Sequence, residues 1–122
     1  MKVEELSGAA LDWAVFSLER EASSWYVNDN GCFMAEEGEI SWKYQPSTNW
    51  AQGGPLIEKY GITITDRSPG HRFKIKGWVA WRGNRNPDMG WNNQPTPLIA
   101  AMQCIVATEL GMEIDVPEGL LP

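Results

Sequence analysis

The residues best suited to chemistry lie within positions 47–61, where Trp50 stands between the amide side chains of Asn49 and Gln52. An indole offers a flat face for stacking, and amide groups both donate and accept hydrogen bonds. Gly53 and Gly54 follow directly, and glycines let another molecule approach the backbone closely. We therefore predict a ligand-lining loop formed by Asn49, Trp50, Gln52 and Gly53. The alternative is a connector between two elements, with Trp50 filling the core.

A second candidate group follows residue 80, where the chain becomes rich in Gly, Asn and Pro up to residue 94. It contains Trp81, Arg82, Arg85 and Trp91. Guanidinium groups bind phosphates in a fork, and aromatic planes stack on bases. Together with the first group, these residues favour a nucleotide-sized anionic ligand. The competing interpretation is that the tryptophans fill the core and the loop residues serve turns.

Motifs of known catalytic sites are missing from the chain. It has no Gly-x-Ser-x-Gly elbow, no phosphate-binding loop of the Walker type and no His-Glu-x-x-His pair. The single histidine, His71, stands beside a turn and is expected on the surface. The two cysteines, Cys32 and Cys104, are too few for a disulfide framework and do not form a metal-binding pair. We expect no enzyme, no cofactor and no metal site.

The net charge of −6 is unevenly distributed along the chain. Residues 67–85 contain six of the ten Lys and Arg residues and no Asp or Glu. An acidic protein is a poor ligand for a DNA or RNA duplex, whose phosphates attract cations. The basic segment is either a solvated strand face or a local anion site.

A chain of 122 residues is long enough for one packed domain, which we place at residues 1–122 with an irregular tail at residues 112–122. No apolar run approaches the roughly 20 residues that cross a bilayer. The acidic N-terminal sequence lacks the apolar core of a signal peptide. We therefore expect a cytoplasmic protein that does not bind membranes.

Three helices are predicted. The first starts at Ser7, with apolar residues at helical spacing (Leu11, Val15, Leu18 and Ala22). The second is short and opens at Pro55. The third is capped by Thr96, opens at Pro97 and ends at Gly111.

Alternating aromatic and β-branched residues predict strands at residues 25–27, 32–34, 40–44, 62–65 and 71–81. The first two flank an Asn-Gly turn and form a hairpin. Residues 82–94 are expected to be a loop. The fold class is therefore α+β, with an antiparallel sheet of four to six strands, two main helices packed on one face of it, and a short helix after the Gly-Gly-Pro loop.

Three blocks of this sequence, in the same order, resemble the NinX family of small tailed-phage proteins. They are Leu-Ser-Gly-Ala-Ala-Leu-Asp-Trp-Ala-Val at residues 6–15, Pro-Ser-Thr-Asn-Trp-Ala-Gln-Gly-Gly-Pro-Leu-Ile-Glu at residues 46–58, and Pro-Thr-Pro-Leu-Ile-Ala-Ala-Met at residues 95–102. The resemblance implies a phage origin and an accessory role in the host cytoplasm. It supplies no catalytic residues, because the family has no agreed biochemical activity.

From these observations we expect a non-enzymatic phage accessory protein that binds a small nucleotide-like anion and sequesters a host immune signal. Stoichiometric capture requires a tight pocket and no catalytic set, and the pocket could lie across the subunit boundary of a homo-oligomer. The alternative is a protein-interaction module that inhibits or recruits a host factor through exposed tryptophans.

Overall fold

The structure is a computed structural model that describes residues 2–19, 25–28, 31–35, 41–66, 77–82 and 91–120. In this part of the chain the fold is α+β, with three α-helices, two short 3-10 helices and six strands. The α-helices are α1 (Gly8–Glu19), α2 (Trp50–Tyr60) and α3 (Pro97–Leu110), and the 3-10 helices are η1 (Val3–Glu5) and η3 (Glu118–Leu120). The strands are β1 (Trp25–Asn28), β2 (Gly31–Ala35), β3 (Ser41–Tyr44), β4 (Ile62–Asp66), β5 (Trp78–Arg82) and β6 (Trp91–Gln94).

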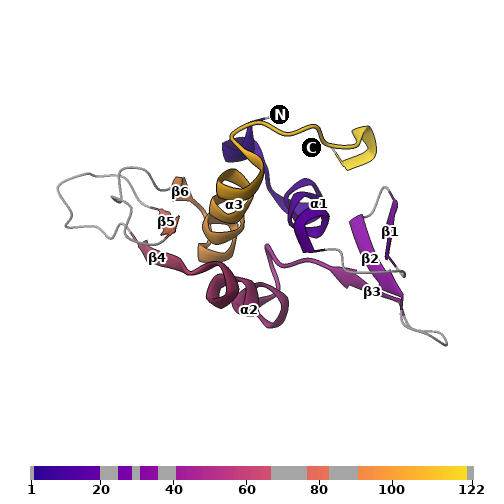
Figure 1. Cartoon of the computed structure of the whole chain (residues 1–122), viewed down its shortest axis with the longest axis horizontal. Coiled ribbons are helices and arrows are strands. Elements are labelled where there is room, and N and C mark those ends of the chain that lie inside the picture. The colour runs from indigo at the N-terminus through magenta and orange to yellow at the C-terminus, as the bar shows by residue number, and fades with distance from the viewer. Residues whose placement is uncertain are drawn as a thin grey trace.

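The six strands form two separate antiparallel sheets, with the orders β1-β2-β3 and β4-β5-β6. Figure 1 shows the sheets at opposite ends of the molecule, with α1 and α3 between them and α2 beneath these helices. The α+β class is confirmed. A single sheet of four to six strands is not, and the two main helices lie between two small sheets instead of covering one face of a large one.

The helices supply most of the core because α1 and α3 are apolar on more than one side. Leu11, Val15, Met102 and Ile105 are fully buried, and α3 is buried continuously from Ala100 to Val106. A helix that is apolar almost all round is one that packs on several partners. Accordingly, α3 packs against α1, α2 and the β4-β5-β6 sheet.

The core also contains a buried amide side chain. Gln103 of α3 is 1% exposed, and its Nε2 donates to the carbonyl of Leu6 at 2.7 Å and to Oε1 of Gln94 at 3.2 Å. Buried amides are stable only when hydrogen-bonded. Gln103 thus joins α3 to the segment before α1 and to β6.

The predicted hairpin is confirmed: β1 pairs with β2, and Asn28 lies opposite Gly31. The first sheet meets α1 through the ring of Tyr44, which packs edge-on against Phe16 with 6.5 Å between the ring centroids. The predicted strand at residues 71–81 is described only from residue 77, and β5 begins at Trp78.

Two boundaries differ from the prediction. Helix α2 begins at Trp50, and Pro55 lies inside it instead of opening it. Pro55 cannot donate to the carbonyl of Ala51, but Ala51 is exposed, so water can reach that carbonyl. Residues 91–94, expected in a loop, form strand β6, because pairing with β5 outweighs the low strand preference of Asn92 and Asn93.

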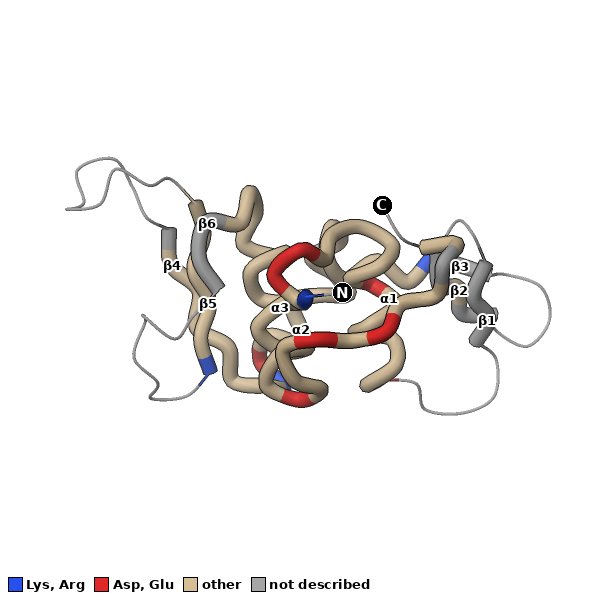
Figure 2. The backbone as a smooth tube through the Cα atoms, turned by 90° about the horizontal axis from the view of Figure 1, so that it is seen from above, with Lys and Arg blue, Asp and Glu red and all other residues tan. Residues whose placement is uncertain are grey.

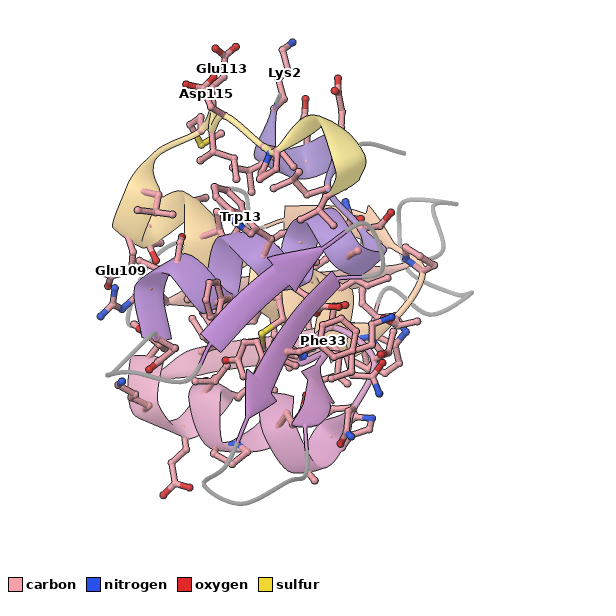
Figure 3. All side chains as sticks on the ribbon, turned by 90° about the vertical axis from the view of Figure 1, so that its right-hand side faces the viewer. Lys2, Trp13, Phe33, Glu109, Glu113 and Asp115 are labelled. Carbon is pink, nitrogen blue, oxygen red and sulfur yellow. The ribbon has the colours of Figure 1, made fainter. Side chains whose placement is uncertain are left out.

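The two ends of the described chain lie together. Lys2 and Glu113 form an antiparallel bridge, and the amide of Val3 donates to the carbonyl of Met112 at 2.9 Å. Leu120 is buried, and Ile114 and Val116 pack against the core. Figure 3 shows Lys2, Glu113 and Asp115 pointing outward here, with Trp13 on the side of α1 that faces these segments. Leu121 lies outside the described residues, and the division into one domain with an irregular tail stays a prediction.

Candidate functional site

Helix α2 carries the first group of predicted site residues, and local sequence sets both of its ends. Asn49 is the N-cap, and its Oδ1 accepts a hydrogen bond from the amide of Ala51 at 2.9 Å. Gly61 ends the helix in the left-handed conformation, with φ of 66°. The Asn49 side chain therefore has a structural partner at the start of α2.

Gly53 lies on the inner face of α2, against the turn at residues 46–48 and against α3. A Cβ at this position would lie 2.8 Å from Cδ2 of Leu98 and closer still to the carbonyl oxygen of Pro46. Backbone cannot move aside as a flexible side chain can, so only glycine fits here. The close approach at Gly53 is made by the protein itself.

Gln52 also serves the fold. Its Oε1 accepts from the amide of Gln45 at 2.5 Å, and its Nε2 donates to the carbonyl of Lys43 at 2.9 Å. Both ends of the amide side chain thus bind the backbone at the end of β3. Gln52 fixes the angle at which the chain passes from the first sheet into α2.

A buried acid holds the same turn from the other side. Asp12 of α1 is 3% exposed, and its Oδ1 accepts from the amide of Ser47 at 2.9 Å. Burial raises the pKa of Asp12 to about 6, because removal from water disfavours the charged form, while the hydrogen bond from the Ser47 amide opposes the rise. The sequence did not indicate this role of Asp12, since a single acid within an apolar helical pattern can be either buried or exposed.

The outer face of α2 is different. Trp50 is 56% exposed, and Ala51 and Pro55 beside it are exposed too. A Cβ at Gly54 would meet no atom within 4 Å. Trp50 therefore does not fill the core. We call Trp50, Ala51, Gly54, Pro55 and Glu58 the outer face of α2.

Arg82, from the second group, lies at the opposite end of α2. It pairs with Ile62 across the β4-β5 ladder, its Cζ lies 5.5 Å from the centroid of the Tyr60 ring, and its guanidinium binds the carboxylate of Glu109. Because α2 rises about 15 Å over its length, Arg82 and Trp50 do not converge. The partner of Arg82, Glu109, follows a helical run of apolar residues, and its sequence position gave no sign of this pairing.

Other charged groups gather around Tyr60. Lys59 binds Glu19 at 2.7 Å and lies 5.4 Å from the centroid of the Tyr60 ring. Burial is the main cause that raises the pKa of Tyr60, and a hydrogen bond to Glu19 is the second cause. Figure 2 shows the acidic positions of the described chain lying mainly on the helical segments between the two sheets. Lys59 and Arg82 are thus each paired with an acid of the same molecule.

The remaining predicted site residues are only partly described. Trp81 is half-buried on β5, opposite Thr63 of β4. Trp91 lies on β6, and only its backbone is described. Arg85 and most of the basic segment at residues 67–85 lie outside the described residues. A ligand site that combines these residues with Trp50 stays a prediction.

A cleft between the chain ends has a volume of about 210 Å³ and is lined by Lys2, Glu4, Met112 and Glu113. Sites for drug-sized ligands usually measure roughly 300–1,000 Å³. None of the predicted site residues lines the cleft. Within the described ranges, no three His, Cys, Asp or Glu residues come close enough to hold a metal ion.

Most of the chain matches a known protein family. The family model described as "Bacteriophage P22, NinX" matches residues 2–109. The chain belongs to this family. A search of the curated proteins gives no match for this NinX family member. In the described part of the chain, its helices lack the length and apolar character needed to cross a bilayer.

Proposed function

We propose that this NinX family member is a non-enzymatic phage accessory protein that acts in the host cytoplasm by binding another protein through the outer face of α2. The observation that carries this proposal is the exposure of Trp50. Tryptophan is among the residues most often found as an interface anchor, because it buries a large area and keeps one hydrogen-bond donor.

The composition of the outer face also supports protein binding. A helix face that stays in water is usually charged. From Trp50 to Ile57 α2 has no charged residue, and Trp50, Ala51 and Pro55 are exposed together. Exposed apolar groups that lie side by side are typical of surfaces that contact a partner.

The nucleotide hypothesis is the second candidate, and its support is weaker. Arg82 stacks on Tyr60 and is partly exposed, which suits an anionic aromatic ligand. However, an incoming phosphate would have to displace Glu109 from Arg82. The residues at the start of α2 already bond within the protein, apart from Trp50. We therefore prefer protein binding over sequestration of a host nucleotide signal.

The proposal is tested by capture of proteins from host extract on the immobilised wild-type chain, compared with Trp50→Ala and Met112→Ala. Met112 is 60% exposed at the chain ends and is the matched control. We expect a protein that binds the wild type and Met112→Ala and is reduced at least tenfold on Trp50→Ala. Equal capture by all three chains would contradict the proposal.

A thermal-shift panel of linear and cyclic nucleotides separates the two candidates. Protein binding through α2 predicts no shift of the midpoint with any nucleotide. A shift that disappears in Arg82→Ala would favour the nucleotide hypothesis. Release of a cleaved nucleotide in the same samples would show an enzyme.

A further inference from the structure

We propose that the outer face of α2 binds a second copy of this chain, forming a twofold dimer in which the two α2 helices run antiparallel and cross at Gly54. The inference rests on the proposed function, because it names a partner for the same face. It is carried by three properties of α2: the spacing of its outer residues, its charge distribution and a half-buried glycine at its centre, Gly54, with open space where a Cβ would lie.

The spacing is self-complementary. Trp50, Gly54 and Glu58 follow at steps of four residues, so they form one ridge along the helix. A twofold axis through Gly54 places Trp50 of each copy beside Glu58 of the other, because a symmetric interface repeats each contact in reverse. The indole N–H is a donor and a carboxylate is an acceptor, so the two contacts match chemically.

The acidic residue of α2 is placed unfavourably for an isolated helix, whereas Lys59 in the last turn is placed favourably. The first turn of α2 has no acid, although the N-terminal end of a helix carries a partial positive charge. Glu58 instead lies in the last turn, near the partial negative charge, and makes no ion pair with the described residues. An antiparallel second copy brings its own Glu58 to the start of α2, which removes both defects.

Gly54 explains why the crossing lies at the centre of the helix. Glycine inside a helix is less favourable than alanine, and a Cβ at Gly54 would meet no atom of the described residues within 4 Å. The fold therefore gives no reason for glycine here, in contrast to Gly53. A second helix crossing at Gly54 gives one, since small residues let two helix backbones approach closely.

The outer face remains accessible for such a contact. Figure 1 shows α2 on the side of the helical layers away from both chain ends, so neither terminal segment covers it. The face is small and each chain carries a net charge of −6, so the dimer must be weak. We expect a Kd on the order of 10 µM, at the weak end of the range for specific protein interfaces.

Sedimentation equilibrium of the purified full chain between about 1 and 500 µM tests the inference against this affinity range. We expect a monomer-dimer equilibrium in the wild type. Trp50→Ala should raise Kd at least tenfold, because it removes both aromatic contacts. Gly54→Glu should abolish the dimer by placing two carboxylates at the twofold axis. Glu58→Gln should weaken it about threefold, and Met112→Ala should leave Kd unchanged.

Each variant is first checked for a cooperative unfolding transition, so that loss of the dimer is not mistaken for loss of the fold. A wild-type chain that stays monomeric at every concentration overturns the inference. So does a dimer that survives both Trp50→Ala and Gly54→Glu. Trp50-dependent capture of a host protein by a monomeric chain would leave the proposed function standing and refute the dimer, whereas a dimer without any captured protein would do the reverse.

Discussion

The inner and outer faces of α2 use similar residues for different purposes. On the inner face, Gly53 permits contact with Pro46 and Leu98, and Gln52 binds two backbone groups of the first sheet. On the outer face, Gly54 has open space around it, and Trp50 is more than half exposed. Gly53 is therefore required by packing within the molecule, whereas Gly54, in our proposal, is required by contact with a partner.

The largest expected effect is that of Gly53→Ala. The new methyl group meets the carbonyl oxygen of Pro46 and the side chain of Leu98, so α2 must move away from both. We expect the free energy of unfolding to fall by about 3 kcal/mol or more, as for other overpacked sites. Chemical denaturation measures this value. A loss below about 1 kcal/mol would show that the inner face is not tightly packed.

The pH dependence of the stability of Asp12→Asn tests the role of Asp12, which binds the amide of Ser47 in the turn at residues 46–48. The folded-state pKa of Asp12 is about 6, above its ordinary value of 3.8, so the stabilising contribution of its protonated form is complete below pH 4 and is lost as pH rises through 6. The difference of about two pH units corresponds to about 3 kcal/mol. We expect Asp12→Asn to gain about this much relative to the wild type between pH 4 and pH 7. A constant difference across that range would contradict the raised pKa.

Gln52→Ala removes two hydrogen bonds and leaves the amide of Gln45 without its partner. The expected loss is about 2 kcal/mol, because a partly buried unpaired donor adds to the bonds lost. Urea unfolding of Gln52→Ala and Gln52→Glu separates the two bonds. The glutamate keeps the acceptor for Gln45 but cannot donate to Lys43, so it should fall between alanine and wild type. Equal losses for the two variants would mean that only the bond to Lys43 matters.

Gly54→Ala is the matched control for Gly53→Ala and has the smallest effect, with the opposite sign. Its methyl group enters open space, and alanine favours the helix. The chain should gain about 0.5–1 kcal/mol in free energy of unfolding. Destabilisation comparable to that of Gly53→Ala would remove the distinction between the two faces.

Local patterns predicted much of the fold. Helical spacing in α1, the Thr96 cap and Pro97 of α3, and the hairpin of β1 and β2 all follow from neighbouring residues, and each is found. The division into two sheets was not predictable in this way, because it depends on which strands meet across long sequence distances. Strand β6 shows the same limit, since Asn92 and Asn93 are in a strand only through pairing with β5.

The partners of the candidate site residues could not be predicted from the sequence, for a physical reason. Residue types indicated what Asn49, Gln52 and Arg82 could bind, but not that each would find a partner within the chain. An amide bonds equally well to a ligand or to a backbone carbonyl. Trp50 keeps its candidate role because it is exposed, and exposure is set by tertiary packing.

Two-dimensional NMR of the indole N–H of Trp50 tests the central claim, that the outer face of α2 is a contact surface, most directly. The resonance is assigned by its loss in Trp50→Phe and is followed from about 10 µM to 1 mM, a range that starts near the expected Kd and extends well above it. We predict that it shifts with concentration together with the amide of Gly54, while the amide of Gly53 stays in place. Shifts confined to the chain ends around Met112, or no shift at any concentration, would contradict self-association through this face.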